Sequence, residues 1–197
     1  LVYEGREIDM NPSKSAFAQP SDLRTLDDVI AEADLFLGLS GPGVLKQDHV
    51  RQMTQRQPIV FALANPTPEI LPDLVREVAP DAIIATGRSD FPNQVNNVLC
   101  FPFIFRGALD VGATQINDEM QLACIDGIAE LARATTSAEA AAAYQGEQMT
   151  FGADYLIPKP FDPRLVGIVS SAVAKAAMET GVATRPIKDL EAYKTKL

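Results

Sequence analysis

Three short apolar runs mark the first half of the chain. They are Asp-Leu-Phe-Leu-Gly at residues 34–38, Pro-Ile-Val-Phe-Ala-Leu-Ala at 58–64 and Ala-Ile-Ile-Ala at 82–85. Continuous apolar runs of this length are typical of parallel strands that are covered on both faces. Amphipathic stretches separate them, and strand–helix alternation with short connections predicts an α/β fold built on a doubly wound, Rossmann-like parallel sheet.

Helices are predicted between these runs. Thr25 precedes an acidic residue at capping-box spacing and is expected to open one helix. A second helix is expected from about Leu45 to Gln55. Thr67 is a candidate N-cap for a third, which would place Glu69 at the positive end of the helix dipole.

The second half of the chain has helical periodicity. The expected helices are residues 101–111, one capped by Asn117, an alanine-rich one from Ser137 to about Tyr144, one that starts at Asp162-Pro163 and stops at Gly181, and a short amphipathic tail at 189–197. We therefore expect one domain over residues 1–197. Its sheet part would cover about 1–110 and its helical part about 111–197.

Composition and charge exclude several classes of protein. The 197 residues carry a net charge of −9, which argues against a nucleic-acid partner, since such partners call for a basic surface. No apolar run approaches the roughly 20 residues of a membrane span. Cys100 and Cys124 stand in apolar or helical sequence, which indicates free thiols in a reducing cytoplasm. The first residues contain no initiator methionine or signal layout, so we expect the middle of a longer protein.

The segment from Thr86 to Asp110 holds the densest candidate chemistry. It follows a predicted strand end, the place where α/β folds bind ligands. Four carboxamides lie within Asn93–Asn97, and an amide can donate and accept hydrogen bonds without carrying a charge. Two interpretations are open: these side chains hold a ligand, or they shape an asparagine-rich loop that caps the next helix.

Two other groups favour structural interpretations. Arg88 and Asp90 are expected to form an ion pair, although Arg88 has the geometry to face a substrate carboxylate. His49 is the single histidine of the chain, and its polar neighbours predict a position on the surface of a helix.

The chain resembles the malic enzymes, especially the large bacterial type. The most specific block is Gly-Arg-Ser-Asp-Phe-Pro-Asn-Gln-Val-Asn-Asn at 87–97, and supporting blocks occur at 36–42, 63–69 and 157–162. The resemblance covers essentially the whole chain. It implies an enzyme that oxidatively decarboxylates malate to pyruvate and CO2 with NADP or NAD and with Mg or Mn.

The resemblance also implies roles for individual residues. Leu39, Ser40 and Gly41 would lie against the dinucleotide. Asn65 and Asn97 would contact substrate and nicotinamide. Lys14 would contact the 2′-phosphate of NADP, since a basic residue near this place favours that group in the family and an ammonium group offsets such a dianion. The other interpretation of Lys14 is an ordinary surface lysine.

No glycine fingerprint of the form G-x-G-x-x-G opens a helix after a first strand here. In the family that fingerprint, the catalytic tyrosine and lysine and the metal-binding carboxylates would all precede Leu1. We therefore assign no catalytic residue and no metal ligand to this chain. We expect a sheet that lacks its first strand and a fragment that is inactive alone.

Malate and pyruvate, the missing N-terminal part of the same enzyme and further copies in a homo-oligomer are the implied partners. In the large bacterial enzymes a phosphate-acetyltransferase-like domain follows this region. The alternative is a non-catalytic module for nucleotide binding or oligomerisation. A glycine fingerprint with a tyrosine–lysine pair upstream would favour the enzyme, and a start codon just before Leu1 would favour the module.

Overall fold

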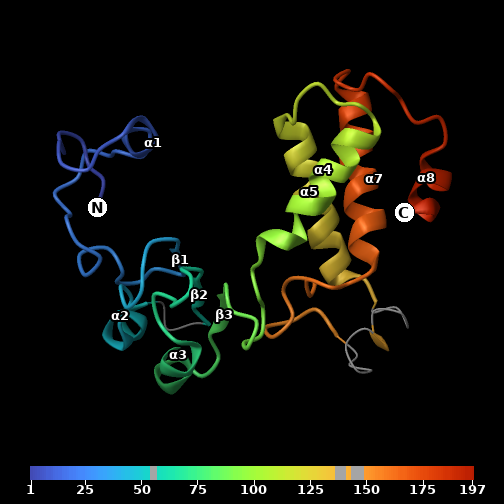
Figure 1. Ribbon diagram of the computed structural model, residues 1–197. Helices are drawn as coiled ribbons and strands as arrows, with labels where there is room; N and C mark the ends of the chain where they lie inside the picture. The colour runs from blue at the N-terminus through green and yellow to red at the C-terminus, as the bar shows by residue number, and fades with distance from the viewer. Residues whose placement is uncertain (54–56, 136–140, 143–148) are drawn as a thin grey trace. The chain divides into compact units, whose positions relative to one another are not determined.

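The computed structural model describes residues 1–53, 57–135, 141–142 and 149–197 (Figure 1). The chain divides into two compact units, Leu1–Ile83 and Ile84–Leu197. The alanine-rich helix that Ser137 was expected to cap lies outside the described residues. None of the described helices has the length and apolar character that a membrane crossing requires.

The first unit is built on parallel strands. Strands β1 (Leu35–Gly38), β2 (Ile59–Ala62) and β3 (Ile83–Thr86) form a sheet in the order β1-β2-β3, and the boundary between the units falls within β3. The pairing of β1 with β2 is parallel, with Leu35 opposite Ile59 and Gly38 opposite Ala62. The prediction of an α/β fold with a parallel sheet is confirmed.

Burial alternates along β2 instead of being continuous. Val60 and Ala62 are fully buried, whereas Ile59 and Phe61 are half-buried and Leu37 of the neighbouring β1 is 55% exposed. Successive side chains of a strand point to opposite faces of the sheet, so one face is covered and the other is open in this structure. The expectation of cover on both faces is therefore met on one face only in β1 and β2, whereas in β3 the consecutive residues Ile84, Ala85 and Thr86 are all buried.

Short helices complete the first unit. They are α1 (Pro12–Ser15), α2 (Gln47–Gln52) and α3 (Pro72–Val78), and α2 packs against α3.

Two predicted helix starts in this unit are wrong. Thr25 begins no helix, because the backbone makes a single turn and Glu32 then adopts a left-handed conformation with φ of 61°. Thr67 is not an N-cap either, since α3 begins five residues later, after Leu71. Glu69 does not lie at a helix terminus, and its side chain is fully buried.

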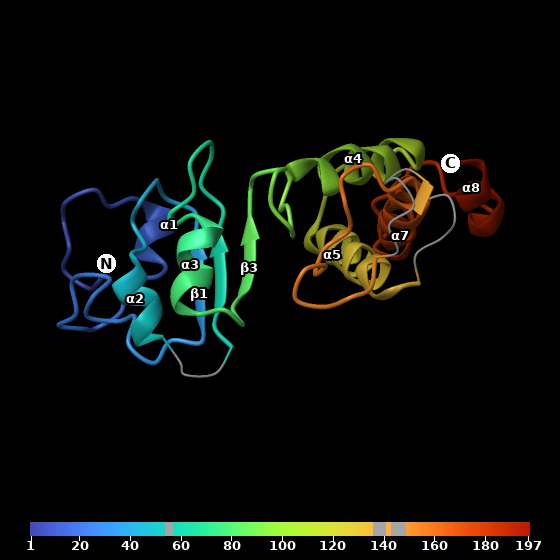
Figure 2. The ribbon, with the colours of Figure 1, turned by 90° about the horizontal axis from the view of Figure 1, so that it is seen from below.

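The second unit is helical. It contains η1 (Asn97–Leu99), α4 (Phe101–Asp110), α5 (Asp118–Arg133), α7 (Arg164–Glu179) and α8 (Leu190–Lys196). Helices α4 and α5 both pack along α7, as Figure 2 shows. The core between them is formed by buried apolar side chains, among them Met120, Leu131, Leu165, Val169 and Val173.

The ends of these helices follow the sequence expectations. Asn117 caps α5, and its side chain accepts a hydrogen bond from the Met120 backbone at 3.0 Å. Asp162 accepts one from the Arg164 backbone at the start of α7. After α7, Gly181 has a φ of 74°, a left-handed conformation that glycine adopts without steric cost.

Candidate functional site

The carboxyl ends of β1 and β2 form the candidate site of the first unit. The Leu63 backbone amide donates to the Gly38 carbonyl at 3.0 Å, so the backbone stays paired just beyond the ends of β1 and β2. Leu39-Ser40-Gly41 continues from β1, and Asn65 follows β2 by three residues. The parallel pairing thus brings these predicted residues together at one edge of the sheet, where ligands bind in folds of this type.

The groups at this edge suit a dinucleotide. Leu39 is 74% exposed, and Ser40 and Asn65 are exposed as well. A Cβ atom added to Gly41 would meet nothing within 4 Å, so open space adjoins the backbone there. An exposed apolar side chain beside a hydroxyl and a carboxamide fits the flat rings and polar edges of a nicotinamide nucleotide.

The buried carboxylate of Glu69 hydrogen-bonds to the backbone at this edge of the sheet. Glu69 accepts a hydrogen bond from the Ser40 backbone amide at 2.8 Å and another from the Ala64 amide at 3.1 Å. Sequence reasoning missed this role because Glu69 follows a threonine and a proline, a pattern that suggests a helix start. The available signal was an acidic residue only five positions after the end of the apolar run at 58–64.

Two of the four carboxamides in the Asn93–Asn97 block have structural roles. The Asn93 amide nitrogen donates to the carbonyls of Ile84 and Ala153 at 2.9 and 2.6 Å, and its oxygen accepts from the Leu156 amide at 2.7 Å. Asn96 caps η1 by accepting from the Val98 amide. The interpretation as a structured loop is therefore correct for these two residues.

Asn97 differs from these two neighbours. It is the first residue of η1, and its side chain is exposed. It belongs to the second unit, whereas Asn65 belongs to the first.

A cavity of about 830 Å³ lies in the second unit. One wall is formed by residues 89–94 and the other by residues within 149–161. Asn93 lies in the first wall and joins it to the second segment, because its side chain hydrogen-bonds to Ala153 and Leu156. The volume lies in the range of small-molecule pockets.

Arg88 and Asp90 form the predicted ion pair. The guanidinium donates to both carboxylate oxygens, at 2.8 and 2.6 Å. The hydrogen bond from Arg88 lowers the pKa of the Asp90 carboxyl group. The Nε and Nη2 groups of the guanidinium both face Asp90, so the predicted ion pair is confirmed.

His49 is not at the surface, so that prediction is wrong. Its side chain is almost fully buried, and Nε2 lies 2.8 Å from a carboxylate oxygen of Asp27. Nδ1 accepts a hydrogen bond from the Lys46 amide at the start of α2. With Nδ1 as acceptor, Nε2 is the donor to Asp27. The ring also completes the capping box of α2.

Lys14 lies on α1, and its ammonium group donates to the Asp9 carbonyl at 2.7 Å. It is exposed to solvent. As for metals, the described residues contain no group of three or more His, Cys, Asp or Glu side chains arranged to hold an ion. This part of the chain therefore offers no ligand set for a divalent metal, and we derive no step through one.

A parallel α/β sheet with small and amide residues at its carboxyl edge defines a nucleotide-binding α/β domain. Comparison with known families makes the class specific. Residues 3–144 match the family model described as the malic enzyme NAD binding domain, and the chain belongs to this family.

Relatives and solved structures agree with this assignment. The chain is 63% identical to the NADP-dependent malic enzyme of Escherichia coli and 60% identical to the NAD-dependent malic enzyme of Rhizobium meliloti, over the whole chain in each case. It spans only 26% of the length of each relative.

The crystal structure of Entamoeba histolytica malic enzyme matches 99% of this chain and 39% of its own chain, with a TM-score of 0.80 and 33% identity. The structure of malic enzyme from Pyrococcus horikoshii matches 87% of this chain and 36% of its own, with a TM-score of 0.69 and 38% identity.

Proposed function

We propose that this chain is part of an oxidoreductase that converts malate to pyruvate and CO2 with NADP or NAD, and that it supplies contacts to cofactor and substrate. The observation that carries this proposal is the convergence of residues 39–41 and Asn65 at the carboxyl edge of a parallel sheet, in a member of the malic enzyme NAD-binding family. The names of the relatives, which include both NADP- and NAD-dependent enzymes, support the reaction.

In this proposal the nicotinamide, when bound, accepts a hydride from C2 of malate. Leu39, Ser40 and Gly41 lie along the dinucleotide and exclude water from one side of it. The carboxamides of Asn65 and Asn97 hold malate and the nicotinamide group, since an amide donates to a carboxylate and accepts from another amide. Their exposure supports these roles, because an exposed amide is free to turn toward a ligand.

The intact enzyme would also use a divalent metal, Mg or Mn, since such an ion supplies Lewis-acid chemistry. We place its ligands and the catalytic acid and base outside this chain, as the resemblance to the malic enzymes implies. We also place the enzyme in the cytoplasm, as a homo-oligomer.

Replacement of the two asparagines in the intact enzyme tests the proposal. Asn65→Ala and Asn97→Ala should each raise the malate KM or lower kcat by about 10- to 100-fold, the worth of a hydrogen bond to a charged group. Gln121→Ala is the matched control, since Gln121 is an exposed carboxamide on α5. Unchanged kinetics in both asparagine variants would remove the assignment.

The preference for NADP is proposed to rest on Lys14. Its ammonium group is exposed and held by one backbone carbonyl, so it can reach a 2′-phosphate at little cost. Lys14→Gln should weaken NADP binding much more than NAD binding. Equal effects on the two cofactors would leave Lys14 as a surface lysine.

The isolated fragment is proposed to be inactive. Leu35 and Leu37 of β1 are substantially exposed on the open face of the sheet, which calls for apolar cover from the rest of the enzyme or from another copy. Residues 1–197 alone, with metal present, should give no malate-dependent NADPH signal above a blank. Robust turnover would show that the catalytic groups lie within this chain.

A further inference from the structure

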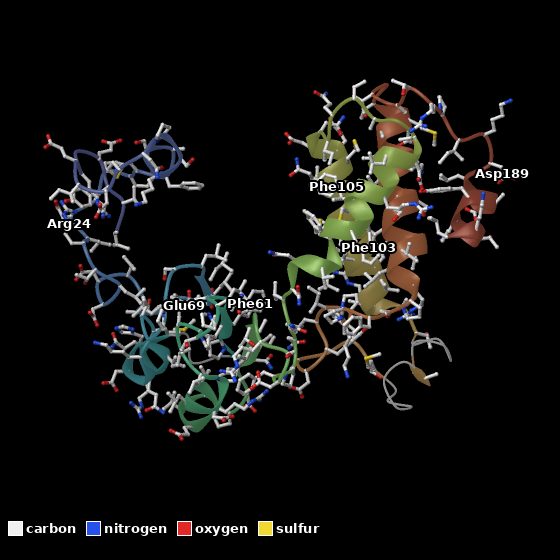
Figure 3. All side chains as sticks on the ribbon, in the orientation of Figure 1. Arg24, Phe61, Glu69, Phe103, Phe105 and Asp189 are labelled. Carbon is white, nitrogen blue, oxygen red and sulfur yellow. The ribbon has the colours of Figure 1, made fainter. Side chains whose placement is uncertain are left out.

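Glu69 is the most unusual group in the first unit, and it is labelled in Figure 3. It is an acidic residue whose exposed fraction is 0%, and burial of a carboxylate is costly unless hydrogen bonds satisfy it. Among the described residues, its carboxylate receives two hydrogen bonds, and both come from backbone amides at strand ends. One oxygen binds Ser40, just past β1, and the other binds Ala64, just past β2.

The backbone carbonyls of Pro68 and Glu69 also hydrogen-bond to the loop that follows β1. The Glu69 carbonyl accepts from the Leu45 amide at 3.2 Å, and the Pro68 carbonyl accepts from the Gly43 amide at 3.3 Å. The loop that follows β1 is therefore fastened at residues 40, 43 and 45, each time to Pro68 or Glu69. The carboxylate is the one group in this set that also holds the end of β2.

Gly38 provides the space for this arrangement. A Cβ atom added at Gly38 would lie 2.5 Å from Cδ of Glu69 and 2.8 Å from each carboxylate oxygen. Any side chain at this position would displace the carboxylate from Ser40 and Ala64. The glycine at the end of β1 and the acid at position 69 thus form a pair, one of which makes room for the other.

We infer that Glu69 is a positioning residue, which holds the Ser40–Gly41 loop and the segment leading to Asn65 in the arrangement that receives the nicotinamide cofactor and malate. This inference rests on the proposed function. It adds that the buried carboxylate, with Gly38, sets the distance between the two strand-end segments. Glu69 touches neither ligand, and it acts through the backbone of Ser40 and Ala64.

The carboxylate form matters because both of its partners are donors. A carboxylate accepts with two oxygens, whereas the amide of glutamine has one oxygen and one NH2 group. Glu69→Gln keeps the size of the side chain but turns a donor toward Ser40 or Ala64, so one of the two bonds is lost. The variant therefore removes one of the two hydrogen bonds to the strand ends with little change in packing volume.

The first experiment uses Glu69→Gln in the intact enzyme, with Glu77→Gln as a matched control. Glu77 is an exposed glutamate of α3 in the same unit. Glu69→Gln should raise the KM for the dinucleotide and lower kcat/KM for malate by about 10- to 100-fold, as expected when reacting groups are displaced by about 1 Å. A purely structural role would instead lower the folded fraction, and with it the apparent kcat, while the KM values stayed unchanged.

Hydrogen exchange gives a second reading that does not depend on catalysis. In Glu69→Gln the Ser40 or Ala64 amide should exchange at least tenfold faster than in the wild type. The Leu63 amide, which binds Gly38 within the extended ladder, should keep its rate and serves as the internal reference. Uniform acceleration of all three amides, or of none, would overturn the inference.

A double-mutant cycle tests the pair with Gly38 and does not require Glu69→Gln to fold well. Gly38→Ala should impair cofactor binding in the wild type but should have little further effect in a Glu69→Ala background, where the space is free. Additive effects would overturn the pairing. If the wild-type enzyme shows no malate-dependent reduction of NAD or NADP, the proposed function fails, whereas the exchange rates still decide whether Glu69 holds both strand ends.

Discussion

Asn93 offers a sharp test of how this fold is held together, because one side chain makes three hydrogen bonds. Its amide binds the carbonyls of Ile84 and Ala153, and its oxygen binds the Leu156 amide, at 2.9, 2.6 and 2.7 Å. Its backbone has a φ of 56°, in the left-handed region that asparagine tolerates better than most residues. Replacement by glycine removes the three bonds and leaves the backbone conformation accessible.

The expected loss can be worked out bond by bond. Each hydrogen bond contributes about 1 kcal/mol net, and a partner that stays buried without water loses more. Asn93→Gly should therefore lower the free energy of unfolding by about 3 kcal/mol. Asn93→Ala should cost about 1 kcal/mol more than the glycine variant, because alanine is strained at positive φ.

Urea denaturation of both variants, followed by circular dichroism, measures these losses. Asn97→Ala is the control, since its side chain is exposed and should change stability by no more than about 0.5 kcal/mol. The Leu156 amide should also exchange faster in Asn93→Gly. A glycine variant within about 0.5 kcal/mol of the wild type would refute the reasoning, because the three bonds would then have no net value.

Three further predictions concern the second unit. Gly107→Ala should lower the free energy of unfolding by about 2 kcal/mol in thermal denaturation, since the new methyl group would lie 2.5 Å from the Ser170 carbonyl oxygen. Tyr193→Phe removes a 2.7 Å bond to Asp110 and should cost about 1 kcal/mol at pH 7. Burial and that bond raise the pKa of the Tyr193 hydroxyl above its unfolded value of about 10. The contribution of the hydroxyl to the free energy of unfolding should therefore be complete below about pH 10 and should fall as the pH rises further. Burial, with the neighbouring thiol, raises the pKa of Cys124 to about 12, so iodoacetamide at pH 8 should modify it only after unfolding, as mass spectrometry would show.

Each of these predictions has a control or a refuting outcome. Gly41→Ala should leave stability unchanged, because open space surrounds that position, and an equal loss in both glycine variants would contradict the packing argument. A Tyr193→Phe deficit that persists unchanged above pH 11 would mean that the hydroxyl is not its cause. Modification of native Cys124 at the rate of a free thiol would contradict its burial.

The parallel sheet and the main helices could be predicted because their signals are local. Apolar runs mark the strands, and a cap such as Asn117 is satisfied by amides three residues away. The predictions were wrong where a polar residue near an expected helix start hydrogen-bonds to a partner that is distant in the sequence. Glu69 turns to the ends of two strands, which no local pattern can reveal. His49 hydrogen-bonds to a carboxylate 22 residues earlier, a partner that the residues next to it in the sequence do not indicate.

The same distinction bears on the candidate site. A carboxamide has four hydrogen-bonding positions, and Asn93 uses three of them within the second unit, which leaves little capacity for a ligand. Asn97 is exposed, and among the described residues the Asn65 side chain makes one hydrogen bond, a long contact of 3.5 Å to the Leu63 carbonyl. Composition alone could not distinguish the structural carboxamides of the Asn93–Asn97 block from a candidate ligand-binding one.

Exposure and hydrogen-bond use separate these amides where sequence could not. An asparagine whose donors and acceptors are spent on the backbone stabilises the fold, and its loss should appear in denaturation. An exposed asparagine at the carboxyl end of a parallel strand contributes little to stability, so its loss should appear in KM or kcat. Asn93 is of the first kind and Asn65 of the second. If the site lies where we propose, a variant of Asn93 should lose stability, whereas a variant of Asn65 should keep its stability and change KM or kcat.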